Sequence, residues 1–137
     1  MMVARAALLA LFVVAGTSAA GAEDAIAPGT VFGTADGCTA VSSGQYPASD
    51  DWVVVTRKYM HQHESACEFV QTLPGKDGSL FVNAICSGEG DTWPATFAMI
   101  AGEDDGTLHI ADSNNNPWDL HACEGQTDAA ADKLFGE

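Results

Sequence analysis

The sequence predicts an all-β domain, a small antiparallel β-sandwich or barrel closed by two disulfides, which follows a cleaved signal peptide. Three observations predict it: the chain begins with an apolar stretch, it contains four cysteines, and short β-rich segments alternate with turn residues. An even number of cysteines in a chain sent to an oxidising compartment indicates disulfides. Successive short strands separated by turn signals are typical of antiparallel sandwiches and barrels.

Residues 1–22 have the features of a signal peptide. Arg5 is the only charged residue before Glu23, and it is followed by the apolar run 6–15. This run is about half as long as the roughly 20 residues that a membrane-spanning helix needs. Small residues lead up to Ala22, after which we expect cleavage. We therefore predict a periplasmic or secreted protein with no membrane span after cleavage.

Cleavage would leave one strongly acidic domain. We predict a mobile lead-in over 23–29, a single β domain over 30–126, and a C-terminal tail or short helix over 127–137. The full chain has a formal net charge of -14 at pH 7, and loss of Arg5 makes it one unit more negative. Because phosphate binding depends on Lys and Arg, this charge excludes nucleic acid as an expected partner and favours a cationic one.

The strands are expected in a regular order along the domain. The segment 52–59 is rich in β-branched and aromatic residues and is predicted to form one strand. Turn residues at 74–79 and 102–106 divide the following segments into two hairpins. The full set of expected strands is 30–32, 52–59, 67–73, 80–86, 95–101, 107–111 and 118–123.

The first hairpin also predicts which cysteines pair. Four cysteines allow three pairings, but pairing that is symmetric about the turn sets Cys67 opposite Cys86 and Gln71 opposite Val82. Opposed Cβ atoms on antiparallel strands lie about 5 Å apart, which is close to disulfide range. We therefore predict a bond between Cys67 and Cys86.

The remaining cysteines, Cys38 and Cys123, are then left to pair and to join the two ends of the domain. A bond that closes so long a loop stabilises a fold by about 4 kcal/mol in the chain-entropy model. With all four thiols in disulfides and no nucleophile elbow or phosphate loop in the sequence, we assign no catalytic residue. The sequence favours a non-enzymatic protein and indicates no cofactor.

His61 and His63 are the candidate metal ligands. Alternate residues of a strand point to the same face, so two imidazoles at this spacing can share a metal ion. Glu68 and Gly75 follow at spacings that resemble the first motif of the cupin barrels, in which two histidines and a glutamate bind a metal. The resemblance implies a metal-binding, cupin-like protein that uses His61, His63 and Glu68. Val55 replaces the leading glycine of that motif, and the second motif is missing.

A second pattern lies around the third cysteine, in Cys-Ser-Gly-Glu-Gly at 86–90 followed by Trp93. It continues through Asp-Gly-Thr-Leu at 105–108 and Ile110 to Cys123. This pattern resembles small exported bacterial proteins of unassigned function. The resemblance implies export and a disulfide-closed β-rich domain, without implying an activity.

Ser43-Gly44-Gln45-Tyr46 is similar to the inhibitory loop of the periplasmic inhibitors of C-type lysozyme, which has a Ser-Gly-x-x-Tyr motif. The segment here is one residue shorter and lacks the usual basic residue. These inhibitors are small exported β-barrels with a disulfide. The resemblance implies a hydrolase inhibitor acting through Ser43, Gly44 and Tyr46 on a basic partner such as a lysozyme-type hydrolase, which an acidic chain would attract.

The sequence thus favours an exported, acidic, non-enzymatic binding protein of the cell envelope or secreted fraction, which recognises a protein or wall-associated ligand through its loops. A periplasmic hydrolase inhibitor and a metal-binding protein are the two alternatives.

Overall fold

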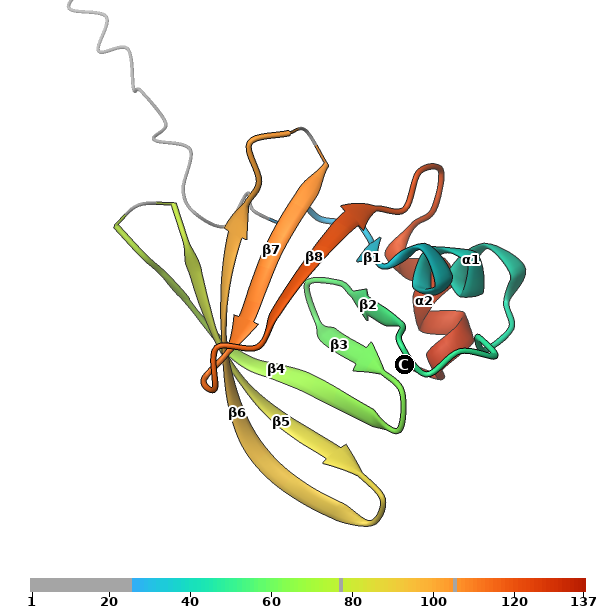
Figure 1. The fold of residues 1–137 in the computed structure, drawn as a ribbon, viewed down its shortest axis with the longest axis horizontal. Helices are drawn as coiled ribbons and strands as arrows, with labels where there is room; N and C mark the ends of the chain where they lie inside the picture. Colours follow the sequence, from blue (N-terminus) through green and yellow to red (C-terminus); the bar gives the residue numbers. More distant parts are fainter. Residues whose placement is uncertain (1–25, 77, 105) are drawn as a thin grey trace, which may run out of the picture.

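The computed structural model describes residues 26–137 except 77 and 105. In this part of the chain, eight antiparallel strands form a closed barrel (Figure 1). Each strand pairs with its neighbours in the sequence, and β1 closes the barrel by pairing with β8. The predicted all-β fold is confirmed as a barrel. The predicted signal peptide and the first part of the lead-in, 1–25, lie outside the described residues.

The two helices lie side by side against one wall of the barrel (Figure 1). Helix α1 is inserted between β1 and β2, and α2 follows β8. In chain order the elements are β1 Phe32–Gly33, α1 Ala35–Ser43, β2 Val53–Val55, β3 Tyr59–Gln62, β4 Ser65–Pro74, β5 Leu80–Gly88, β6 Asp91–Ala101, β7 Thr107–Asp112, β8 Pro117–Ala122 and α2 Asp128–Phe135.

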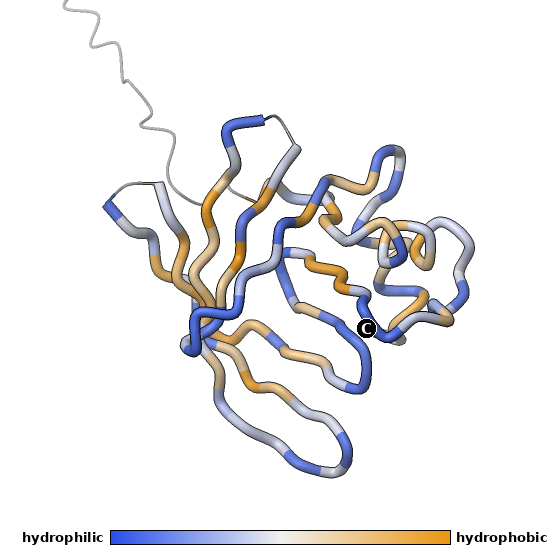
Figure 2. Tube along the Cα trace, in the orientation of Figure 1, coloured by the Kyte–Doolittle hydropathy of each residue, from blue (hydrophilic) through white to orange (hydrophobic). Residues whose placement is uncertain are grey.

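Apolar side chains form two cores on opposite faces of the same strands. Val53 and Val55 point into the barrel, whereas Val54 points outward and packs beneath the helices, as expected from the two-residue period of a strand. Figure 2 shows apolar residues along the strands and hydrophilic residues at the hairpin tips. The outer core holds α1 and α2 against β2 and β3, and this packing positions the loops at that side of the molecule.

The prediction of one strand over 52–59 is wrong in one respect, because the structure divides this segment between two strands, β2 and β3. The Thr56 amide donates to the Tyr59 carbonyl, and the Thr56 hydroxyl accepts from the Lys58 amide. These bonds form a tight turn with Arg57 and Lys58 at its tip. Since no Gly, Pro or Asn marks this turn, the turn-residue rules had no signal to detect.

Both predicted disulfides are confirmed: Cys67 bonds to Cys86 across β4 and β5, and Cys38 of α1 bonds to Cys123. The predicted register is correct at the first of these pairs. It fails at Gln71, which lies opposite Asn83 rather than Val82, because β4 contains a bulge between Phe69 and Gln71. A bulge places one extra residue on one strand, and the symmetric pairing rule did not include it.

Helix α1 was not predicted. Thr34 caps it by accepting a hydrogen bond from the Gly37 amide, and Gly44 ends it in the left-handed conformation. Between these caps most residues of the helix are weaker helix formers than alanine, among them one Gly, one Thr and two Ser. Its stability comes from packing and from the Cys38 disulfide, neither of which is visible in local sequence preference.

The strand register separates two ends of the barrel. The α1 end contains the segment between β1 and β2 and the turns at 63–64, 89–90 and 113–116. The lead-in end contains residues 26–31, the turn at 56–58, and the described residues of the connections from β4 to β5 and from β6 to β7. Ile26, from the predicted lead-in, is buried in the barrel core at this second end. No helix in the described part of the chain is long and apolar enough to span a membrane.

Candidate binding groove

An open groove of about 500 Å³ lies at the α1 end of the barrel. Its walls come from the loop after α1, from β3 with its turn into β4, and from the end of β5. We call it the Tyr46 groove. It is lined by Tyr46, Pro47, Trp52, His61, Gln62, His63, Glu64, Ser65, Ala66 and Ser87. The groove therefore joins the exposed end of the predicted inhibitor loop to both predicted metal-ligating histidines.

Tyr46 is an exposed aromatic side chain that its neighbours hold in place. The Gly44 amide donates to the Ala40 carbonyl, so the chain leaves α1 in a defined direction. The Tyr46 ring then packs edge-on against Trp52 at 6.0 Å and against Phe135 at 5.7 Å between centroids, while 62% of the residue stays exposed. Such a side chain loses little conformational freedom when a partner covers it.

The other two residues of the predicted inhibitor loop serve the end of the helix. The Ser43 hydroxyl donates to the Ala40 carbonyl and accepts from the Gln45 amide. Gly44 provides the left-handed residue after α1, with φ of 69°. Of this loop, Tyr46 is the residue whose ring reaches the groove.

Phe135, in α2, packs against the aromatic side chains of the groove. Its ring is stacked nearly parallel to His61, with centroids 4.1 Å apart, and to Trp52, with centroids 5.8 Å apart. Tyr59 packs edge-on against His61 at 4.7 Å. No sequence pattern indicated that a residue more than 70 positions after His61 would stack on its ring.

His61 is a packed residue in this arrangement. Its ring is largely buried, and Nε2 lies 3.3 Å from Oε1 of Glu137. Burial lowers the pKa of His61 below its usual value, and the opposing effect of the Glu137 carboxylate is smaller. The imidazole is therefore neutral at physiological pH.

His63 has different neighbours. Strand β3 ends at Gln62, so His63 lies in the turn, half-exposed. Its Nε2 is 3.4 Å from Oδ1 of Asp50 and 3.4 Å from Oε1 of Glu64. Both carboxylates are largely exposed. A second hollow adjoins the groove at Trp52, Gln62 and His63, and its lining adds Asp50 and Asp51. We call Asp50, Asp51 and Glu64 the acidic rim.

The predicted metal ligands are only partly brought together. His61 and His63 line one groove but contact different carboxylates. Glu68 is exposed on β4, opposite Tyr59 in the strand register. Among the described residues, no group of three or more His, Cys, Asp or Glu is arranged to hold a metal ion. The metal site at His61, His63 and Glu68 stays a prediction from the sequence.

The chain matches no protein-family model, and no curated protein or solved structure is significantly similar to it. Function is therefore inferred from the geometry and charge of the groove.

Proposed function

We propose that this protein is an extracytoplasmic binding protein that recognises a basic protein partner through the Tyr46 groove. The observation that carries the proposal is the placement of an exposed, aromatically supported Tyr46 beside the acidic rim. The two disulfides support an oxidising, extracytoplasmic compartment, because such bonds form and persist there.

The aromatic residues of the groove and its acidic rim suit different steps of recognition. Tyrosine and tryptophan dominate the binding energy of many protein interfaces, where they form a supported centre surrounded by polar residues. Exposed carboxylates add little affinity singly, but they raise the association rate of an oppositely charged partner. A net charge of -14 extends this attraction over the whole molecule. We therefore assign the main contact to Tyr46, and the choice of a basic partner to Asp50, Asp51 and Glu64.

Site-specific photo-crosslinking in the cells that produce the protein tests this assignment. A benzophenone amino acid replaces Tyr46 in one variant and Phe81 in a second. Phe81 is a matched control, because it is an exposed aromatic residue on β5 whereas Tyr46 lies at the α1 end. The expected result is an adduct with one basic protein from position 46 and none from position 81. An adduct from position 81 alone, or an acidic partner at position 46, would contradict the proposal.

A lysozyme-type inhibitor is the second candidate function. The observation that favours it is that Tyr46, the last residue of the inhibitor-like motif, is the part of that motif that faces the groove. We expect the protein to inhibit a C-type lysozyme at low ionic strength and the Tyr46→Ala variant to lose at least tenfold in inhibition. Lysozyme activity that is unchanged by a large molar excess of protein at low salt would exclude this candidate. The broader proposal would still depend on the crosslinking result.

A further inference from the structure

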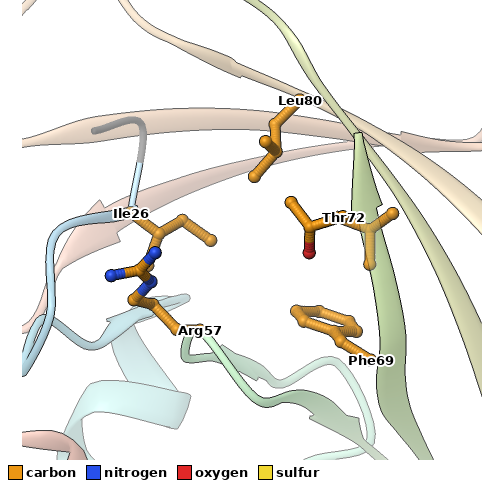
Figure 3. A pocket seen from close by; sticks show the side chains of 6 residues that line it. Ile26, Arg57, Phe69, Thr72 and Leu80 are labelled. Atoms are coloured by element: carbon orange, nitrogen blue, oxygen red, sulfur yellow. The ribbon is translucent and has the colours of Figure 1, made fainter. Parts of the chain in front are cut away.

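A small, partly open cavity lies at the opposite end of the barrel, the lead-in end. It has a volume of about 90 Å³ and is lined by Ile26, Arg57, Phe69, Thr72, Leu80 and Val82. Figure 3 shows these side chains arranged around an open centre, with the Arg57 guanidinium beside Ile26 at its edge. Barrels of eight strands either fill their interior with side chains or hold one small ligand. Here the filling is incomplete at one end.

The inner wall of the cavity is formed by apolar side chains of the barrel core. Ile26, Leu80 and Val82 are all buried in the barrel core, and Phe69 packs against that core. The Phe69 ring also contacts Phe97, with centroids 6.3 Å apart. An apolar cavity of this kind gains free energy when a hydrocarbon group fills it, because the wall atoms recover missing contacts.

Arg57 is unusual in this chain. The protein has 19 acidic residues against five basic ones, and the adjacent Lys58 pairs with Asp132. Arg57, in contrast, has no ion-pair or hydrogen-bond partner among the described residues. The tight turn between β2 and β3 places its guanidinium at the cavity. A guanidinium beside a hydrocarbon wall, without a partner in the part of the chain that the structure describes, suits a planar anion, which it can bind through two parallel hydrogen bonds.

Thr72 adds a second polar group to the same opening. It belongs to β4, on the part of the strand that follows the bulge after Phe69. Its side chain lines the cavity and has no hydrogen-bond partner among the described residues. A threonine hydroxyl can donate to a carboxylate oxygen. The cavity therefore presents hydrocarbon on its inner side and two donor groups at its rim.

We propose that this cavity binds a short aliphatic carboxylate, with its hydrocarbon chain against Ile26, Leu80 and Val82 and its carboxylate at Arg57 and Thr72. The volume is smaller than the roughly 150 Å³ of a cavity that takes up benzene, which limits the enclosed part of the ligand to a few carbons. The carboxylate remains at the rim, where it keeps part of its hydration. This site is at the other end of the barrel from the Tyr46 groove and does not depend on the proposed function.

A titration followed by amide chemical shifts tests the site with butyrate as the probe. For a ligand of six heavy atoms, we expect a dissociation constant of about 1 mM. The shift changes should centre on Arg57, Phe69, Thr72 and Val82. Butanol has the same carbon chain without the charge and should bind at least tenfold more weakly. Octanoate tests the size limit, since the enclosed volume should give its longer chain no gain over butyrate.

Two variants with the same net charge separate a specific site from the general effect of net charge on the binding of an anion. Arg57→Gln should weaken butyrate binding at least tenfold, whereas Lys76→Gln, at the exposed turn between β4 and β5 of the same end, should stay within twofold of the wild type. Thr72→Val tests the hydroxyl with little change of shape and should weaken binding severalfold. Equal binding by Arg57→Gln and the wild type, or no saturable shift up to 100-fold above the expected dissociation constant, would overturn the proposal.

Discussion

Ionisable side chains at the contact between α2 and the barrel show how single residues couple the helix to the strands. Tyr59 is buried, and its hydroxyl donates to Oδ1 of Asp132 at 2.9 Å. Asp132 also accepts a hydrogen bond from Lys58, which lowers the Asp132 pKa; the bond from Tyr59 lowers it further. Burial raises the pKa of Tyr59 above its usual range. His61, two residues along β3, is held neutral by burial against Phe135. The stability of this region therefore depends on the protonation states of these side chains.

The His61 environment predicts a specific pH dependence. The folded protein has a lower His61 pKa than the unfolded chain, where it is about 6.5. Between these two pKa values the unfolded state binds more protons, so stability rises with pH and is lost as pH falls below about 6.5. His61→Phe keeps a ring to stack on Phe135 and removes the titration. Urea unfolding from pH 8 to pH 5 should show a steeper loss of stability for the wild type than for this variant.

The comparison between the two proteins isolates one group. His63, His109, His121 and the carboxylates that do not contact His61 are present in both, so their contributions largely cancel in the difference, whereas Glu137 loses its partner in the variant. If the difference in unfolding free energy between wild type and His61→Phe is constant across this pH range, His61 is not held neutral in the way the structure indicates.

Single elements were predicted well where the local sequence determines them and poorly where packing does. The β4–β5 hairpin has turn residues at its tip and cysteines at symmetric distances, and its disulfide was predicted correctly. The β2–β3 turn has neither signal and was missed. Helix α1 has two caps that sequence rules recognise, but its composition favours other structures. Its position is determined by close contact with β2, which only the folded chain provides.

Gly37 permits that close contact. A Cβ atom at this position would lie 2.2 Å from the carbonyl oxygen of Val53 and 2.9 Å from a methyl group of Val54. Gly37→Ala would gain about 1 kcal/mol in helix preference, yet the clash must move α1 away from β2. We expect the free energy of unfolding to fall by about 1 to 2 kcal/mol, measured by denaturant unfolding.

Ser42→Ala is the matched control for this change. Ser42 lies on the exposed side of the same helix, and the substitution also replaces a weaker helix former with alanine. Its effect should stay within about 0.5 kcal/mol of the wild type. If Gly37→Ala is as stable as Ser42→Ala, the contact between α1 and β2 is looser than the structure indicates.

At the scale of the whole molecule, the barrel, its disulfides and its acidity followed from the sequence, whereas the groove did not. The groove combines positions 46, 47 and 52, residues 61–66 and position 87, and Phe135 packs against its aromatic side chains. No local pattern links these segments. Sequence patterns singled out Tyr46 and both histidines for separate reasons, and only the fold shows that they share one surface. Glu64, Trp52 and Phe135 were missed as contributors because their roles depend on that shared surface.

The net charge of the whole molecule does not by itself select one partner. A chain this acidic attracts any basic protein to some extent, so a specific site has to depend on particular carboxylates. The acidic rim is the part of this charge that lies beside Tyr46. Neutralising it should therefore affect recognition more than neutralising the same number of carboxylates elsewhere.

Crosslinking from position 46 in two charge-matched variants tests this most directly. One variant has Asp50→Asn, Asp51→Asn and Glu64→Gln in the acidic rim. The control neutralises three acids in loops at the lead-in end, Glu103→Gln, Asp104→Asn and Glu124→Gln. We predict that the adduct with the basic partner falls at least fivefold in the first variant and stays near the wild-type level in the control. Equal yields in the two variants would contradict recognition through the Tyr46 groove.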